Sequence, residues 1–78
     1  MSITVLSQPG CQPCKAVARY LDKREIDYTY VDVTQDADAL AKIRDLGYQQ
    51  TPVVIAGDEH FSGFQPTRLD QIIATIKN

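Results

Sequence analysis

Hydrophobic and polar residues follow one another along the chain in patterns that predict three helices and four strands. The short, largely β-branched run Ile3–Leu6 ends before Pro9 and Gly10, which is typical of a buried strand. From Cys14 to about Lys23, apolar residues recur every three or four positions, which predicts an amphipathic helix. The polar side of this helix carries the charged residues Lys15, Arg19, Asp22 and Lys23.

The next segment predicts a second strand and a second helix. Residues Tyr28–Val33 alternate aromatic or β-branched residues with polar ones, which indicates a strand. This strand should run parallel to the first, because a helix connects the two. Thr34 is a candidate helix cap, and Gly47 is a natural stop. We expect one apolar helix face formed by Leu40, Ile43 and Leu46.

The last third of the chain predicts a hairpin and a terminal helix. Pro52–Ala56 indicates a third strand, and the turn dipeptide Gly57-Asp58 leads into a short fourth strand around His60 and Phe61. Thr67 can start the last helix. Its apolar stripe is expected to contain Leu69, Ile72, Ile73 and Ile76. The predicted order is β-α-β-α-β-β-α, in one domain that spans residues 1–78.

Composition and charge exclude several classes of function. With 44% hydrophobic and 23% charged residues, the 78-residue chain is typical of a small globular protein. A net charge of −2 gives no reason to expect nucleic acid or an anionic membrane as a ligand. No stretch approaches the roughly 20 apolar residues of a membrane span, and the N-terminus lacks signal-peptide features. We therefore expect a cytosolic monomer.

The motif Cys11-Gln12-Pro13-Cys14 carries the candidate chemistry. It contains the only two cysteines and lies where a helix should begin directly after a strand. The pKa of a free cysteine is ~8.5, whereas helix-start thiols in such motifs fall to about 3.5–7.5. Cys11 is placed to be the attacking thiolate and Cys14 the resolving thiol, while Pro13 stiffens the first turn. No cofactor besides this redox-active cysteine pair is expected.

Other interpretations of the two cysteines remain open. A permanent disulfide across so short a loop removes little unfolded-state entropy, and a cytosolic thiol pool would reduce it. A zinc or iron–sulfur site needs four ligands, and His60 is the only other soft ligand, so such a site would need a second chain or an external thiol. Lys15 can assist the thiolate or simply point to solvent. We assign His60 no chemistry and expect it in a turn or an edge strand.

Thr51-Pro52 is a second candidate element of the site. A proline at the start of a central strand loses a hydrogen bond of the sheet, so it suggests a turn that can contain a cis bond. Beside a dithiol, such a turn leaves the preceding backbone free to pair with an extended substrate. An ordinary trans proline that begins a strand is the alternative.

The order of elements and the motif C-x-P-C resemble the thioredoxin fold in its small glutaredoxin form, with a four-stranded mixed sheet flanked by three helices. Two further segments resemble the NrdH-redoxin family. Residues 47–54 match its pattern G-[FY]-x-Q-x-P-V-V, and residues 61–66, Phe-Ser-Gly-Phe-Gln-Pro, are similar to its W-S-G-F-R-P. The resemblance spans nearly the whole chain.

This resemblance implies a thiol–disulfide oxidoreductase with Cys11 as nucleophile, Cys14 as resolving thiol and Pro52 as a cis-proline facing them. It also implies reduction by thioredoxin reductase and delivery of electrons to a class Ib ribonucleotide reductase. A glutathione-dependent glutaredoxin is the alternative, and a two-chain metal or cluster carrier is a third candidate. Substrate and partner contacts are expected at Gln12, Pro13, Thr51, Pro52, Phe61, Ser62, Gly63 and Phe64.

Three departures from the family patterns bear on partner choice. Phe61 and Gln65 replace the family's Trp and Arg, and Gln8 stands where a basic residue often precedes the first cysteine. The indole N–H and the guanidinium fork are thereby lost. Glutathione-binding glutaredoxins have a Gly-Gly-x-Asp turn where this chain has Ser62–Pro66. Phe61 and Phe64 either pack in the core or form an apolar patch beside the cysteines.

Overall fold

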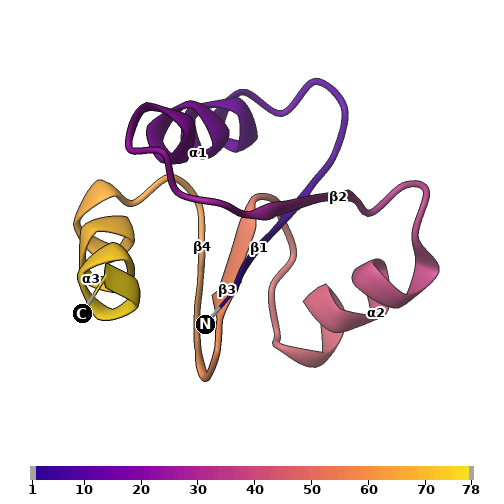
Figure 1. Cartoon of the computed structure of the whole chain (residues 1–78). Helices are drawn as coiled ribbons and strands as arrows, with labels where there is room; N and C mark the ends of the chain where they lie inside the picture. Colours follow the sequence, from indigo (N-terminus) through magenta and orange to yellow (C-terminus); the bar gives the residue numbers. More distant parts are fainter. Residues whose placement is uncertain (1, 78) are drawn as a thin grey trace.

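Seven helices and strands follow one another in the order predicted from the sequence (Figure 1). The computed structural model describes residues 2–77, with the backbone alone at residue 77. The elements are β1 (Ile3–Ser7), α1 (Gln12–Lys23), β2 (Thr29–Asp32), α2 (Ala37–Asp45), β3 (Val53–Ala56), β4 (Glu59–Ser62) and α3 (Pro66–Lys77). None of these helices combines the length and the hydropathy that crossing a bilayer requires.

The four strands form one mixed sheet in the order β2-β1-β3-β4. β1 and β2 are parallel, with Val5 opposite Tyr30, as expected for two strands joined by a helix. β3 lies antiparallel to β1 and pairs Val54 with Val5, and the β3–β4 hairpin pairs Val54 with Phe61. Because β1 and β3 are neighbours, the loop that follows β1 and the segment that precedes β3 lie at the same end of the sheet.

Two hydrophobic clusters cover the two faces of the sheet, with α1 and α3 on one side and α2 on the other (Figure 1). Neighbouring residues of a strand point to opposite faces, so Val54 belongs to one cluster and Val53 to the other. The first cluster contains Ile3, Val5, Val17, Leu21, Ile26, Val54, Ala56, Phe61, Leu69, Ile72 and Ile73. The second contains Leu6, Val33, Ala39, Ile43 and Val53.

The start of α2 differs from the prediction. Asp36, and not Thr34, is the N-cap, because its carboxylate accepts a hydrogen bond from the backbone N–H of Ala39 at 3.1 Å. Thr34 instead donates its hydroxyl and backbone N–H to the carboxylate of Asp32, closing a turn after β2. Ala39 is buried against the sheet, whereas Leu40, which was predicted to share the apolar face with Ile43, is exposed.

Helix ends otherwise agree closely with the sequence patterns. After α2, Gly47 adopts a φ of +85°, and the N–H of Tyr48 donates to the carbonyl of Ile43, as in a Schellman motif. α1 begins at Gln12 and α3 at Pro66, two residues and one residue earlier than predicted. Both shifts include a proline, which the first turn of a helix tolerates because its N–H needs no partner there.

The cap of α2 gives a stability prediction. Asp36→Ala should lower the free energy of unfolding by about 1 kcal/mol, because the N–H of Ala39 loses its carboxylate partner. Thr34→Ala removes only an exposed hydroxyl contact, so its cost should stay below about 0.5 kcal/mol. Urea unfolding followed by circular dichroism measures both. A larger loss for Thr34→Ala would mean that Thr34 caps the helix after all.

Candidate active site

The loop between β1 and α1 holds Cys11 at the start of the helix. Ser7 ends β1 with its hydroxyl donating to the carbonyl of Val31 at 3.0 Å, which satisfies a buried polar side chain. Gly10 then adopts a φ of +76°, a conformation that favours glycine. Cys11 follows in an extended conformation and is the N-cap of α1. The strand, the turn and the helix together fix where its sulfur lies.

Cys11 and Cys14 are joined as a disulfide, with their Cα atoms 5.2 Å apart. The Sγ atom of Cys11 accepts a hydrogen bond from the backbone N–H of Cys14 at 3.1 Å. Cys11 keeps 8% of its surface exposed, whereas Cys14 is fully buried. Cys14 is therefore the more protected of the two residues. Of the two cysteines, only Cys11 keeps any contact with solvent.

The residues between the two cysteines lie at the rim of the site. Gln12 and Pro13 occupy the first two positions of α1, and both are exposed. Lys15 is also exposed, and its backbone N–H donates to the carbonyl of Cys11 at 3.3 Å. The positive end of the α1 dipole thus faces the outer sulfur, and it favours an anion there when the disulfide is open.

Thr51 and Pro52 lie beside the disulfide although they are distant in sequence. The hydroxyl of Thr51 donates to the Sγ atom of Cys11 at 3.5 Å, across 40 positions of the chain. The Thr51–Pro52 peptide bond is cis, as the family resemblance implied, and Pro52 is buried. The N–H of Gly63 donates to the carbonyl of Pro52 at 2.9 Å, which holds the loop after β4 next to Pro52.

The segment Phe61–Phe64 divides between the core and the surface. Phe61 is 3% exposed and packs in the core on the α1 side, so it does not belong to the predicted partner-facing surface. Phe64 is 39% exposed and contacts the ring of Tyr20 edge-on, with 5.8 Å between ring centroids. Ser62 and Gly63 are half-buried between them. Phe61 lies on β4, whereas Phe64 follows Gly63 in the loop between β4 and α3.

Gln65 and Arg68 contact the segment in which the family pattern has Trp and Arg. The Gln65 amide donates to the carbonyl of Ser62 at 2.7 Å and closes the turn after β4. The guanidinium of Arg68 lies 5.3 Å from the centroid of the Phe61 ring, within the range of a cation–π contact.

His60 and the other polar side chains that the structure describes form no group of three metal ligands. His60 lies on the edge strand β4, as expected, and its Nδ1 is 2.7 Å from the hydroxyl of Tyr48. Within residues 2–77, no three side chains of His, Cys, Asp or Glu converge on one point.

The sequence model of the Glutaredoxin family matches residues 3–61, which include the disulfide and Thr51–Pro52. The glutaredoxin-like protein NrdH of Salmonella typhimurium is 36% identical over 75 residues, covering 96% of this chain and 93% of that protein. This chain belongs to the glutaredoxin family, in its NrdH-type branch. The gene 56 protein of Mycobacterium phage D29 is also 36% identical, over 91% of this redoxin and 81% of the phage protein.

A solved structure has the same architecture. The NrdH-redoxin of Escherichia coli superimposes with a TM-score of 0.87 at 35% sequence identity, covering 91% of this redoxin and 93% of that chain. The predicted thioredoxin/glutaredoxin fold, with its mixed four-stranded sheet and three helices, is therefore confirmed.

Thr51 provides a test of the geometry around the outer sulfur. In the reduced redoxin, Thr51→Val should move the pH midpoint of Cys11 alkylation upward by about half a pH unit, because the thiolate loses a hydroxyl donor. Thr51→Ser retains a hydroxyl and should leave the midpoint unchanged. Iodoacetamide labelling across a pH series, read by mass spectrometry, measures both. Equal midpoints for the valine and serine variants would show that the hydroxyl does not act on the sulfur.

Proposed function

We propose that this redoxin is a dithiol electron carrier that reduces protein disulfides through Cys11 and Cys14. The observation that carries the proposal is the placement of the two sulfurs, with Cys11 capping α1 at the surface and Cys14 buried behind it. A sulfur at a helix N-terminus meets backbone N–H groups and a partial positive charge, which favour the thiolate over the thiol. The thiolate is the species that attacks a disulfide.

The exchange proceeds in two displacements. The Cys11 thiolate attacks one sulfur of the substrate disulfide, whose S–S bond breaks and releases one substrate thiolate that takes up a proton. The Cys14 thiol then loses its proton and attacks the Sγ atom of Cys11, releasing the second substrate thiol. Two electrons pass to the substrate, and the Cys11–Cys14 disulfide is formed. Thr51 lies beside the outer sulfur, where its backbone can pair with an extended substrate.

Replacing the buried sulfur separates the two displacements. Cys14→Ser should retain the attack by Cys11 but lose the release step, so a mixed disulfide with the substrate should accumulate. Non-reducing electrophoresis and mass spectrometry detect this species and identify the trapped protein. Cys11→Ser, the matched control, should trap nothing. If Cys11→Ser traps the partner instead, the roles of the two sulfurs are reversed.

We further propose that thioredoxin reductase supplies the electrons and that a class Ib ribonucleotide reductase receives them. Identity of 35–36% to NrdH proteins over most of the chain supports this circuit. The relative from Escherichia coli is described as having a thioredoxin-like activity profile. The proposed location is the cytosol, and the proposed redox group is the cysteine pair itself, with no added cofactor.

The turn after β4 favours this circuit over reduction by glutathione. Glutaredoxins that bind glutathione are expected to have a Gly-Gly-x-Asp turn, whereas this redoxin has Ser62–Pro66. The amide of Gln65 is occupied by the carbonyl of Ser62. The segment therefore offers neither an acidic side chain nor a second glycine to a tripeptide ligand.

Coupled reduction tests the proposed electron donor. The oxidised redoxin, mixed with thioredoxin reductase and NADPH, should consume one NADPH per Cys11–Cys14 disulfide, because two electrons open one S–S bond. Glutathione with glutathione reductase should give a much slower reaction at equal enzyme concentration. NADPH absorbance follows both reactions. Faster consumption in the glutathione assay would assign the protein to glutathione-dependent reduction.

A further inference from the structure

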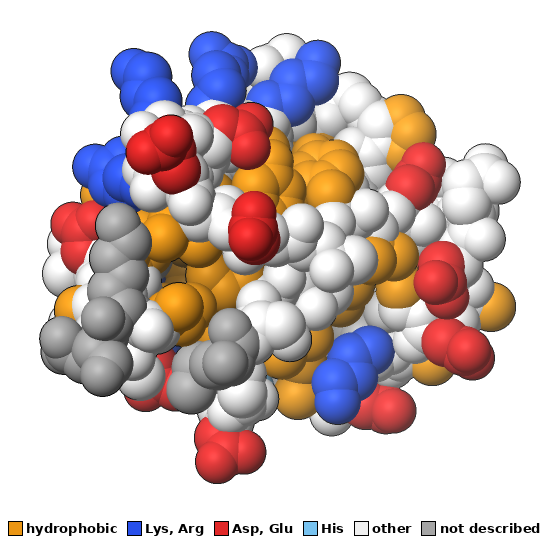
Figure 2. All heavy atoms as spheres, viewed as in Figure 1, with side chains coloured by type: hydrophobic (Ala, Val, Ile, Leu, Met, Phe, Trp, Pro, Cys, Tyr) orange, Lys and Arg blue, Asp and Glu red, His pale blue; other side chains and the backbone are white. Residues whose placement is uncertain are grey.

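Side-chain charge is distributed unevenly along this redoxin. Residues 1–24 contain four basic side chains and one acidic side chain, whereas residues 25–78 contain four basic and nine acidic ones. The segment that ends with α1 therefore has a formal charge of +3 and the rest of the chain −5. Figure 2 shows Lys and Arg side chains gathered over α1 along the upper edge of the molecule. The helix that carries the cysteines is thus the basic part of an acidic protein.

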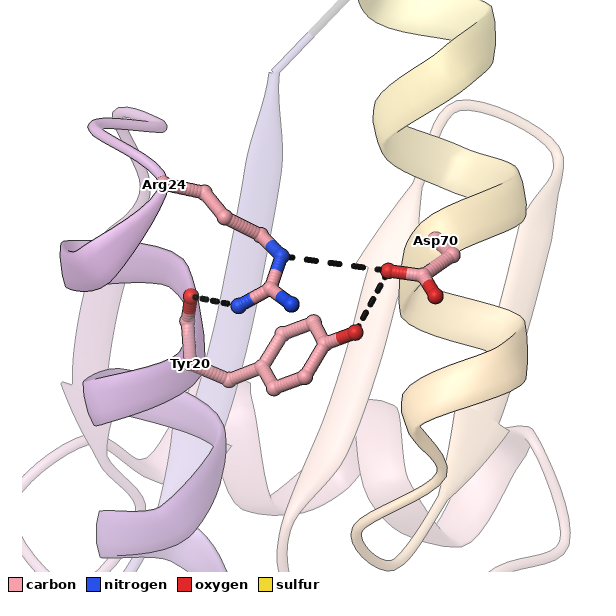
Figure 3. A network of polar contacts seen from close by, with 3 residues as sticks. All are labelled: Tyr20, Arg24 and Asp70. Atoms are coloured by element: carbon pink, nitrogen blue, oxygen red, sulfur yellow. Dashed lines mark hydrogen bonds and ion pairs between the residues drawn. The ribbon is translucent and has the colours of Figure 1, made fainter.

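Three of these cations are not neutralised by carboxylates of the described residues. Lys15, Arg19 and Lys23 are exposed at four-residue spacing along α1 and make no ion pair within residues 2–77. Arg24 differs, because its guanidinium lies 3.5 Å from the centroid of the Tyr20 ring and 3.9 Å from the carboxylate of Asp70 (Figure 3). The exposed row is therefore available to an external anion.

A groove with an aromatic wall lies next to this row. Ala16, Arg19, Tyr20 and Lys23 line a depression of about 280 Å³ on α1. The Tyr20 hydroxyl donates to the carboxylate of Asp70 on α3, which raises the pKa of Tyr20 and holds its ring in place (Figure 3). Phe64 meets the same ring edge-on. The groove therefore combines apolar surface with a basic rim.

The groove lies close to the disulfide. Ala16, at one end of the groove, follows Cys14 by two residues, which is a rise of about 3 Å along the axis of α1. Phe64 directly follows Gly63. The N–H of Gly63 donates a hydrogen bond to the carbonyl of Pro52, which is next to Thr51 and the Sγ atom of Cys11. A polypeptide whose disulfide reaches Cys11 can therefore extend along α1 without leaving the surface.

We propose that Lys15, Arg19 and Lys23, with the aromatic wall of Tyr20 and Phe64, form a docking surface for an acidic segment next to the disulfide of the protein substrate. This surface is called the α1 basic surface. The proposal rests on the proposed thiol–disulfide exchange and adds a charge requirement to it. Several exposed ion pairs acting together change binding by about tenfold and steer the encounter.

The closing experiment uses two synthetic peptides with one Cys-x-x-Cys disulfide and either glutamate or glutamine on both sides of it. Pre-reduced redoxin is mixed with each peptide, the reaction is quenched with acid, and the peptide thiols are counted. The readout is the rate ratio of the glutamate to the glutamine peptide, in which any general change of thiol reactivity cancels. At low ionic strength the native redoxin should give a ratio of about ten.

Matched charge reversals locate the effect. Arg19→Glu with Lys23→Glu should bring the ratio to one or below, whereas Lys42→Glu with Arg44→Glu should keep it well above one. Both pairs change the net charge equally, and both lie on exposed helix positions. α2, which carries Lys42 and Arg44, covers the opposite face of the sheet. Circular dichroism checks that each double variant is folded.

The outcomes separate the two proposals. A ratio near one for the native redoxin, with both peptides reduced, overturns the α1 basic surface but leaves the dithiol function in place. Equal loss in the two double variants also overturns it, because the effect then follows net charge alone. Failure to reduce either peptide overturns the proposed function and, with it, the docking surface. If a double variant does not fold, the rate ratio of the native redoxin is measured at increasing ionic strength instead. The proposal requires this ratio to fall toward one, because salt screens exposed charges.

Discussion

The hydrogen bond from the backbone N–H of Cys14 to the Sγ atom of Cys11 is the contact on which the site depends. At most helix starts an oxygen of Ser, Thr, Asp or Asn accepts this bond. Here a sulfur takes that place, so the group that stabilises the helix end is also the group that reacts. Its surroundings favour a negative charge, because the N–H of Cys14 donates to it and the positive end of the helix dipole lies beside it.

The rest of the fold serves to hold that sulfur at the surface beside a second segment of the chain. β1 and β3 are central neighbours in the sheet, and the loops at one end of these strands bring Thr51 next to Cys11. The N–H of Gly63 donates a hydrogen bond to the carbonyl of Pro52, so the loop after β4 lies at the same end of the sheet. Three loops thus meet at the end of the sheet where Cys11 lies. Such a site needs no deep cavity, because its proposed substrate is a polypeptide that approaches from outside.

The proposed chemistry and the proposed docking surface use different parts of this molecule. The two sulfurs depend on backbone groups and on buried contacts, whereas the side chains of Lys15, Arg19, Lys23 and Phe64 are exposed. The turn after β4 illustrates this independence. Gln65 closes it by a bond to Ser62, and Arg68 covers the ring of Phe61, although the family's Trp and Arg are missing.

The sequence by itself determined the order of elements, the cysteine pair and its place at a helix start, because these depend on local spacing and on residues with strong backbone preferences. The prediction of Thr34 as the cap of α2 was wrong because Thr34 and Asp36 are both good caps. Thr34 is instead engaged in the turn with Asp32, which leaves Asp36 to cap the helix. Only the tertiary structure decided that Phe61 is buried and Phe64 exposed, and that Thr51 reaches Cys11. Those facts depend on strand pairing between distant segments, and hydrophobic spacing within one segment does not specify its neighbours.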